Sequence, residues 1–589
     1  MKSENIFKTR VPSLVFVITN TKKTYSEGEI SMKRSKRFLG LAVGAMMLLS
    51  SGAFAACNVV NDAKDSNKDV DSVQQGDYDK TDAVELIIDG GGQNAAYNTT
   101  ESLIYDKYTN PYPYNTLEKL AEEWNRAHTE ETGFYFTVAK SSIDNNRETM
   151  LPMLQKGTAP DLIYYLPTTI TEDQNKGYFY DLTDALKQPN VYSAAGEAGS
   201  EKWSDIWSSE EFSSEVAPNG QRFTVALEWN PIGFLYNKTL LNAAGVTEEP
   251  ETFKEFMEAQ DAINAYAKTV NRADPTDDSD YICPYFYIYP WYNSYLESTL
   301  RASDLDVLDV INPNGMVDAE EFARGYMLKD ENGERLYSPD DETAVELYRL
   351  VREKSKYFPT NYTSYYAEQQ FAAGNLVMLE VTGGNIRELI DQVDGDFEVG
   401  VFPYPYVETQ PEGEVESSYY TTVETEGKYV RRGMSGYCTG YAITKSAFDS
   451  SCDYYKGDGA KEACIDMLMW LSCYKNNDRM INDLGFAIPL SGSTTYEYFE
   501  KLSSVYETDR ASEDTIAWSA VTAGANVNKS YYDACYLFNQ TAISAADLDE
   551  VKEKLTSVLM NSFKNTISNL YNMNKWDQTK WPPAGTTNS

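Results

Sequence analysis

Basic side chains are scarce in this chain of 589 residues. Lysine and arginine together number 51, against 90 aspartate and glutamate residues, and the formal net charge at pH 7 is −39. Nucleic acids are polyanions that bind proteins largely through lysine and arginine, so an acidic chain repels them. The composition therefore argues against a nucleic-acid partner.

Histidine is scarcer still, because His128 is the only one in the chain. A catalytic triad needs a histidine beside its nucleophile, and multi-histidine metal sites need several. His128 lies in a polar helix end, where we interpret it as a solvated surface residue. Neither a histidine-based triad nor a multi-histidine metal site is expected.

Cysteine occurs seven times, and no two cysteines form a CxxC pair, so a zinc or thiol redox site is not expected. The cysteines other than Cys57 are even in number, which permits disulfides in an exported protein, but their spacing fixes no pairing. Cys464 and Cys473 fall in a mainly apolar helical pattern and are predicted to be buried thiols. Residues 309–341 match no calcium loop, and we expect neither a metal ion nor a cofactor.

The N-terminal region has the features of a bacterial export signal. Basic residues at 33–37 precede an apolar run at 38–49 that is too short to span a membrane. Phe54-Ala55-Ala56-Cys57 follows, and small residues before a cysteine resemble a lipoprotein cleavage site. We predict a signal peptide over residues 32–56 and a lipid on Cys57. The alternative is ordinary cleavage near Ala56, which would release the protein.

Residues 1–31 do not suit a position ahead of a signal peptide, and Met32 is a natural start. We interpret residues 1–31 as an upstream extension of the reading frame. Residues 57–82 are polar and are predicted to form a flexible tether. A coil of about 24 residues spans roughly 27 Å root-mean-square, enough to lift a folded body off a membrane surface.

The chain is organised around the stretch from Phe223 to Gly245. A strand is predicted at 223–227 and a second apolar run at 232–236. Glu-Trp-Asn-Pro at 228–231 separates them, and proline cannot donate to a strand ladder. Asn237 then caps a short helix that ends at Gly245.

A strand that breaks at a carboxylate, an aromatic ring and a proline suits a crossing between two lobes. Such a crossing places Glu228, Trp229 and Asn230 at the mouth of a cleft, and we predict that they contact a ligand. The alternative interpretation is a bent strand in one large sheet.

Other candidate contacts are glycine-rich or aromatic. Gln93 ends a glycine-rich loop, whose glycines either let the backbone approach a ligand or form a bare turn. Trp291 and Tyr292 belong to the run YICPYFYIYPWYNSY at 281–295. That run suits a cleft wall or a buried aromatic cluster. Trp518 is a candidate aromatic cap over the cleft.

The body of the chain alternates strand and helix patterns, and its length suits two or three lobes. Strands are predicted at 84–88, 134–139, 162–166, 376–380 and 433–444, and residues 397–403 are predicted to form the return crossing between the lobes. Helices are predicted to begin at Asn115, with Trp124 in the core, at Thr252, with Glu255 completing a capping box, and at Asp341. The tail 491–589 is predicted to be helical, with a buried face formed by Val551, Leu555, Val558, Leu559 and Phe563.

Four stretches carry a family resemblance in a fixed order. They are LEKLAEEWNRAH…MLPMLQKGTAPDLIYY…GYFYDLTDAL, then YNKTLLNAAGV…TFKEFMEAQDAI, then FAAGNLVMLEVTGGNI…DFEVGVFPYP, and finally RRGMSGYCTGYAITKSA…ACIDMLMWLSCYKNNDRMINDLGFAIP. Together they extend over most of residues 84–490. The set resembles the extracellular solute-binding proteins of bacterial sugar-type ABC importers, which are maltose-binding-protein-like and here of lipoprotein form. The resemblance implies an α/β, two-lobed periplasmic-binding-protein-like fold (type II) with crossover hinge segments.

The resemblance also implies particular ligand contacts. Tyr165 and Thr168 lie at a strand end where a first-lobe contact is expected. Gly384 and Asn385 follow a strand where the family often has an aromatic contact, so hydrogen bonding replaces stacking here. Tyr437 lies where the family faces its cleft.

The first lobe is predicted at 83–228 and 404–487, and the second at 231–402 and 490–589. The implied function is capture of a carbohydrate, most simply an oligosaccharide, in the cleft between them. Aromatic rings cover the C–H faces of a sugar, and carboxylates and amides bind its hydroxyls. The implied partners are an ABC permease and, through Cys57, the outer or periplasmic face of the cell membrane.

Three alternatives stay open. No catalytic residues are predicted, but an exported glycoside hydrolase needs only two carboxylates about 5 to 9.5 Å apart, which no local motif reveals. A binding protein for a solute other than a sugar is the second alternative. A surface adhesin or structural lipoprotein is the third, and it would show no thermal shift with small molecules.

Overall fold

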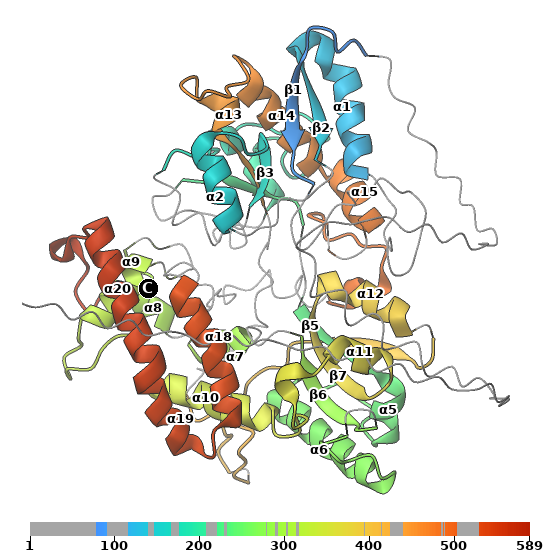
Figure 1. Ribbon diagram of the computed structural model, residues 1–589, viewed down its shortest axis with the longest axis vertical. Helices are drawn as coiled ribbons and strands as arrows, with labels where there is room; N and C mark the ends of the chain where they lie inside the picture. The colour runs from blue at the N-terminus through green and yellow to red at the C-terminus, as the bar shows by residue number, and fades with distance from the viewer. Residues whose placement is uncertain are drawn as a thin grey trace, which may run out of the picture. The chain divides into compact units, whose positions relative to one another are not determined.

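The computed structural model describes residues 78–90, 116–139, 147–165, 176–207, 221–228, 232–277, 280–288, 293–301, 304–311, 313, 317, 319–393, 395–413, 415–423, 440–484, 487, 489–502 and 529–588 (Figure 1). The predicted signal peptide, the predicted lipidation site Cys57 and residues 57–77 of the predicted tether lie outside the described residues. The described residues belong to one compact unit, Asp71–Ser589.

The first sheet has five strands in the order β2-β1-β3-β9-β4. They are β1 (Val84–Ile88), β2 (Phe134–Val138), β3 (Leu162–Tyr165), β4 (Thr224–Ala226) and β9 (Gly440–Ile443). β1 is parallel to β2 and β3, whereas β9 runs antiparallel between β3 and β4. The strands predicted at 84–88, 134–139, 162–166 and 223–227 are confirmed to within one residue at each end.

Helices from both halves of the chain lie around this sheet (Figure 1). They are α1 (Thr116–Thr132), α2 (Arg147–Lys156), η3 (Ala185–Lys187), η4 (Trp203–Ile206), α13 (Lys445–Phe448), α14 (Ala460–Ser472) and α15 (Tyr474–Leu484). α1 packs on β2, α14 and α15. Trp124 of α1 is fully buried, with its ring 4.9 Å from that of Phe136, so its predicted core position is confirmed.

The second sheet has four strands in the order β6-β7-β5-β8. They are β5 (Ile232–Asn237), β6 (Cys283–Tyr287), β7 (Leu376–Thr382) and β8 (Val399–Pro403). β5 is antiparallel to β7 and β8, and β6 is parallel to β7. Helices α5 (Lys238–Ala243), α6 (Phe253–Thr269), α11 (Ala367–Ala372) and α12 (Gly383–Val393) contact its strands.

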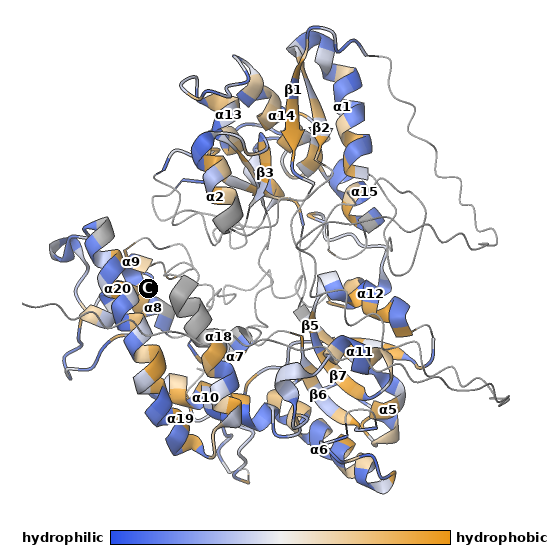
Figure 2. Cartoon of the chain, in the orientation of Figure 1, coloured by the Kyte–Doolittle hydropathy of each residue, from blue (hydrophilic) through white to orange (hydrophobic). Residues whose placement is uncertain are grey.

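The remaining helices lie in two parts of the chain. Before β7 are α7 (Asn293–Leu300), α8 (Leu305–Leu308), α9 (Ala319–Met327), α10 (Glu342–Lys354) and η7 (Tyr362–Ser364). The tail contributes α18 (Lys529–Ser544), α19 (Leu548–Lys554), η8 (Leu555–Met560), α20 (Asn561–Asn574) and η9 (Gln578–Lys580). α10 contacts α7, α18 and α19. Apolar and polar residues are interspersed along α19 and α20, as Figure 2 shows.

Side-chain caps fix where three of the predicted helices start. Asn237 accepts a hydrogen bond from the backbone N–H of Leu240 at 2.9 Å. Thr252 and Glu255 form the predicted capping box. Asp341 accepts from the N–H of Ala344 at 2.8 Å. Each cap satisfies an N–H that the helix itself leaves unpaired, so these predictions are confirmed.

The predicted apolar face of the tail is wrong at one position, Val558, which is 41% exposed. Val551, Leu555, Leu559 and Phe563 are buried as predicted. Residues Leu555–Met560 form a π-helical turn, which is wider than an α-helical turn. The wider turn keeps residues that are four positions apart on one face of the helix, and Val558 lies outside that face.

The interpretation of His128 as a solvated residue is also wrong. His128 is half-buried, and its ring centroid lies 5.0 Å from that of Trp124. Its Nε2 is 3.0 Å from the Tyr192 hydroxyl, which donates to Asp466 Oδ2 at 2.5 Å. Tyr192 is 64 residues from His128 along the chain, and Asp466 is farther still, so a local pattern could not reveal these contacts.

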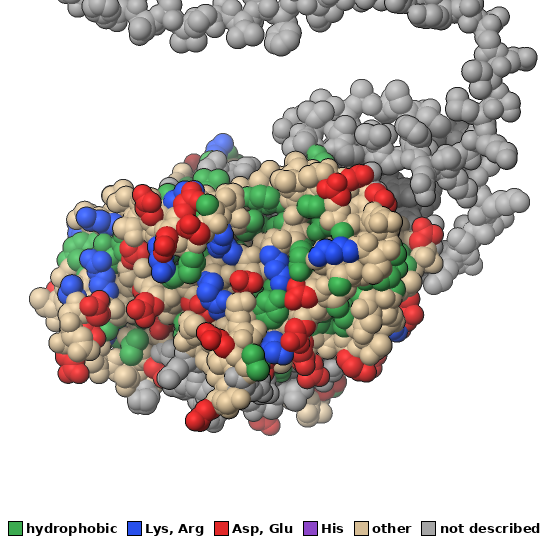
Figure 3. Space-filling view, turned by 90° about the horizontal axis from the view of Figure 1, so that it is seen from below, with side chains coloured by type: hydrophobic (Ala, Val, Ile, Leu, Met, Phe, Trp, Pro, Cys, Tyr) green, Lys and Arg blue, Asp and Glu red, His purple; other side chains and the backbone are tan. Residues whose placement is uncertain are grey.

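Cys464 and Cys473 are buried free thiols, as predicted, and Cys452 is also a free thiol. Within the described ranges, no group of His, Cys, Asp and Glu side chains is arranged to hold a metal ion. None of the helices in these ranges combines the length and apolar character of a membrane span. On the face shown in Figure 3, acidic side chains are interspersed with lysine and arginine.

Candidate functional site: the strand ends of the two sheets

The first part of the candidate site is the edge of the first sheet where β3 and β4 end. Tyr165 and Ala226 both pair with Gly440, the first residue of β9, so the three residues lie side by side. Glu228 follows Ala226 by two residues. In open α/β sheets, ligands bind beyond the carboxyl ends of strands, and this edge has that position.

A buried polar network lies at this edge. The backbone N–H of Tyr164 donates to Asp89 Oδ2 at 3.3 Å, and the Tyr441 hydroxyl donates to the Asp89 carbonyl at 2.7 Å. The Tyr164 hydroxyl donates to Glu228 Oε1 at 3.4 Å. Tyr164 lies in β3. The network therefore attaches Asp89, which follows β1, and Glu228, which follows β4, to β3.

Glu228 therefore differs from its predicted setting. The sequence predicted it at the mouth of a cleft, whereas in the structure Glu228 is only 2% exposed and faces the Tyr164 hydroxyl. A buried carboxylate needs hydrogen-bond donors, and Tyr164 supplies one of them. Direct contact between Glu228 and a ligand stays a prediction.

The second part is the edge of the second sheet where β5 begins. Ile232 pairs with Thr382, the last residue of β7, and Gly233 pairs with Pro403, the last residue of β8. β6 reaches the same edge, because Tyr287 pairs with Glu380. The chain passes from the first edge at Glu228 to this edge at Ile232 through residues 229–231, so the two edges are neighbours along the chain.

At this second edge, α12 begins directly after β7, at Gly383. The Thr382 hydroxyl donates to Asn385 Oδ1 at 2.8 Å. That bond occupies the acceptor end of the half-buried Asn385 amide and fixes the orientation of the Nδ2 donors. Beside it, a Cβ built on Gly384 would meet only Thr382 Oγ1, at 4.0 Å. The arrangement offers N–H donors to a ligand oxygen.

A buried ion pair stands behind this edge. Lys354 Nζ lies 3.3 Å from Glu380 Oε2, and neither side chain is more than 1% exposed. The Tyr285 hydroxyl donates to the same carboxylate, and Lys354 Nζ lies 3.4 Å from the Tyr404 hydroxyl. Burial lowers the pKa of Lys354, and burial together with the Glu380 charge raises the pKa of Tyr285. The pair holds β7, β6 and α10 together below the start of α12.

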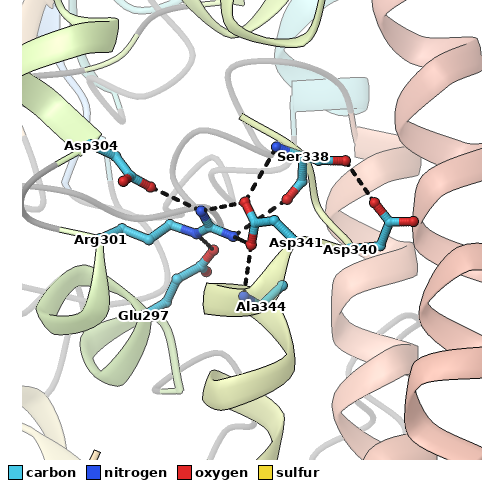
Figure 4. Close-up of polar contacts among 7 residues, drawn as sticks. All are labelled: Glu297, Arg301, Asp304, Ser338, Asp340, Asp341 and Ala344. Atoms are coloured by element: carbon cyan, nitrogen blue, oxygen red, sulfur yellow. Dashed lines mark hydrogen bonds and ion pairs between the residues drawn. The ribbon is translucent and has the colours of Figure 1, made fainter. Parts of the chain in front are cut away.

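A second charge cluster lies away from the strand ends, between α7 and α10 (Figure 4). The buried Arg301 guanidinium contacts three carboxylates: Glu297 at 3.3 Å, Asp304 at 2.9 Å and Asp341 at 2.7 Å. Burial raises the pKa of Glu297 to about 7, against the opposing effect of Arg301. The cluster ties the end of α7 to the N-cap of α10.

The predicted ligand contacts divide into two groups. Glu228 and Tyr165 lie at the first edge, Gly384 and Asn385 at the second, and only the backbone of Tyr165 is described. The others lie outside the described residues: Gln93, Thr168, Trp229, Asn230, Trp291, Tyr292, Tyr437 and Trp518.

Sequence reasoning missed the residues that support the edges. Asp89, Tyr164 and Tyr441 were not predicted as site residues, nor were Lys354 and Glu380. The available signals were a carboxylate directly after the first strand and an ionisable residue inside the apolar strand Leu376–Thr382. Both signals mark a buried charge that needs a partner.

With this geometry in hand, the chain can be compared with known proteins. The family model of bacterial extracellular solute-binding proteins matches residues 119–442, and the chain belongs to this family. The predicted family is confirmed. No curated protein matches the chain significantly.

Solved structures are similar to the chain at low sequence identity. A chitin oligosaccharide binding protein has a TM-score of 0.50 and 16% identity, over 82% of this chain and 100% of that one. A family 1 extracellular solute-binding protein from Bifidobacterium longum subsp. infantis has a TM-score of 0.49 and 14% identity, over 82% and 99%. MalX from Streptococcus pneumoniae, in complex with maltopentaose, has a TM-score of 0.48 and 14% identity, over 82% and 99%. The family match and the structure with a TM-score of 0.50 confirm the predicted two-lobed α/β fold.

Proposed function

We propose that this protein captures a carbohydrate, most simply an oligosaccharide, and delivers it to an ABC permease without chemically changing it. The observation that carries the proposal is the pair of strand edges joined at residues 228–232, within a chain of the solute-binding family. The relative with a TM-score of 0.50 is a chitin oligosaccharide binding protein, which supports a sugar as the ligand class.

The chemistry of the candidate residues fits a sugar. The Asn385 amide presents N–H donors, which suit hydroxyl oxygens. Trp229, Trp291 and Tyr292 would supply aromatic faces for the C–H surfaces of the rings. We assign the remaining contacts to Gln93, Tyr165, Thr168, Glu228, Asn230, Gly384, Tyr437 and Trp518.

The lobes of the proposal follow the two sheets, with residues 83–228 around the first and 231–402 around the second. Residues 440–487 join the first sheet through β9 and α14. The sequence also placed 404–423 in the first lobe. Arg349 of α10, however, donates to the carbonyls of Ser418 at 2.6 Å and Tyr420 at 2.7 Å, which attaches this segment to the second-sheet side.

The proposed setting is the outer face of the cell membrane. A lipid on Cys57 would anchor the protein, and residues 58–82 would serve as the tether. The permease would then read the difference between the empty and the ligand-closed forms.

A thermal-shift screen of the purified protein against mono- and oligosaccharides tests this function. A ligand at 100 times its Kd stabilises the folded state by about 2.7 kcal/mol. One sugar class should raise the melting temperature, and Trp229→Ala or Trp291→Ala should abolish the rise. Tyr366→Ala, at the N-cap of α11 and 57% exposed, is the control and should keep the rise.

The same samples distinguish the alternatives. Release of shorter sugars would identify a glycoside hydrolase and reject the proposal. A shift with peptides or other solutes, and none with sugars, would change the ligand class. No shift with any small molecule would favour a structural lipoprotein.

A further inference from the structure

Asn477, on α15, contacts two chain segments that are distant in sequence. Its Nδ2 donates to the carbonyl of Leu227 at 2.6 Å, and its Oδ1 accepts from the backbone N–H of Leu490 at 2.8 Å. The side chain is fully buried. Both ends of one amide are therefore used, one on each segment.

The first of these segments leads from the first sheet to the second, and the other leads from helix α15 to the second sheet. Leu227 follows β4 of the first sheet, and β5 of the second sheet begins at Ile232. Residues 490–502 leave α15, which packs on α1, and reach β5, where a Cβ on Gly233 would lie 3.0 Å from Leu502 Cδ2. Asn477 thus joins the first segment, where it leaves the first sheet, to the second segment, which follows α15.

The second segment is also linked to β5 of the second sheet, through Glu249. Glu249 Oε1 accepts from the Tyr236 hydroxyl of β5 at 2.7 Å and also pairs with Lys501. The contact between Glu249 and Lys501 is partly exposed, since 45% of the Lys501 side chain is accessible, whereas the contacts of Asn477 are buried away from water. Hydrogen bonds buried away from solvent are costly to break, so the Asn477 contact is the firmer of the two.

We propose that Asn477 is a positioning residue that ties these two connecting segments together, so that they move as one when the protein opens and closes around its ligand. The inference rests on the proposed function, because it concerns the motion that accompanies binding. Asn477 touches no ligand in this scheme. It acts by holding Leu227 and Leu490 at a fixed separation while backbone torsions change between the two sheets.

Asn477→Asp provides a test that pH can switch. A protonated aspartate can donate to the Leu227 carbonyl and accept from the Leu490 N–H, as asparagine does. The ionised form only accepts, and it faces the Leu227 carbonyl. Burial raises the pKa of an aspartate, so the protonated form is accessible in mildly acidic buffer.

The measurement is hydrogen–deuterium exchange on the ligand-free full chain, comparing variant and wild type at the same pH. At pH 8, Asn477→Asp should speed exchange on the order of tenfold in both 224–237 and 489–502, and the difference should shrink at pH 5. Asn477→Ala should match the pH 8 result at both pH values.

Asn482→Ala is the matched control on the same helix. Asn482 accepts from the Thr495 N–H at 2.9 Å and donates to the Ser493 carbonyl at 3.3 Å, so it binds one segment only. It should speed exchange in 489–502 alone. Faster exchange in only one segment of the Asn477 variants would overturn the inference, and so would an Asn482→Ala effect in both.

A ligand from the sugar screen separates this inference from the proposed function. In the wild type, the ligand should slow exchange in both segments together, and in Asn477→Asp at pH 8 it should slow them unequally. Absence of any sugar ligand would reject the function, whereas the ligand-free exchange would still decide whether Asn477 couples the segments.

Discussion

The carboxylate of Glu297 lies 3.3 Å from the guanidinium of Arg301, from Oε1 to Nε, and both side chains are almost completely buried. Asp304 and Asp341 face the same guanidinium. Three carboxylates thus share one positive charge in a site with little water. Burial raises the pKa of Glu297 to about 7, because the ionised form loses its hydration.

This relationship predicts how stability depends on pH. The pKa of Glu297 in the folded state is above its unfolded value of 4.5. The contribution of Glu297 to the free energy of unfolding is therefore fully present below about pH 4.5 and is lost as pH rises through 7. Glu297→Gln removes this penalty. At pH 8 we expect the variant to be more stable than the wild type by on the order of 2 to 3 kcal/mol, and at pH 4.5 about equal to it.

Urea unfolding at both pH values checks this prediction. Glu258→Gln on the exposed i,i+4 pair with Lys254 is the control and should change stability by less than about 0.5 kcal/mol at either pH. Equal destabilisation by Glu297→Gln at both values would contradict the raised pKa.

The buried pair of Lys354 and Glu380 predicts strong non-additivity. Lys354→Met alone leaves a buried carboxylate without its cation, and Glu380→Gln alone leaves a buried ammonium. Each should cost about 3 to 5 kcal/mol. The double variant removes both charges and keeps an acceptor for the Tyr285 hydroxyl, so its cost should be within about 1 kcal/mol of zero. Chemical unfolding of the wild type, the two single variants and the double variant gives the coupling energy between Lys354 and Glu380. Additive costs of the two single substitutions would contradict this prediction.

The sequence predicted the elements whose causes are local. Strand patterns have a period of two residues, and Asn237, Thr252 and Asp341 cap helices a few residues away, so short windows contain the information. The edges of both sheets followed from these elements. The order of family-like stretches then identified the fold.

The supporting network of the site could not be predicted in the same way. Tyr164 and Glu228 are 64 residues apart, and Lys354 and Glu380 are 26 apart, so only the folded chain brings them together. For the same reason, the sequence predicted Glu228 at the mouth of a cleft and His128 in solvent. A carboxylate or histidine in isolation looks exposed, and its partner decides whether it is buried.

The contacts of Arg324 with Pro582 and Pro583 predict that this side chain stabilises the fold by holding the C-terminal tail. This fully buried guanidinium donates to the carbonyls of Val307 at 2.7 Å, Pro582 at 2.9 Å and Pro583 at 2.7 Å. A lysine cannot reproduce this planar fork. Arg324→Lys should therefore cost about 2 to 4 kcal/mol of stability by thermal unfolding. Arg335→Lys, at an exposed position, is the control, and an equal loss there would contradict the role of the fork.

The Thr382–Asn385 bond predicts an effect on affinity by a residue that does not itself need to touch the ligand. Thr382→Val removes the hydroxyl that occupies Asn385 Oδ1, so the amide can rotate and its N–H donors are no longer held toward the ligand. We expect sugar affinity to fall roughly three- to tenfold, with the larger loss in Asn385→Ala, because a hydrogen bond contributes about 0.5 to 1.5 kcal/mol. Thr382→Ser keeps the hydroxyl and should bind like the wild type. Isothermal titration calorimetry with the sugar from the screen measures all three, and an unchanged affinity in Asn385→Ala would remove this residue from the site.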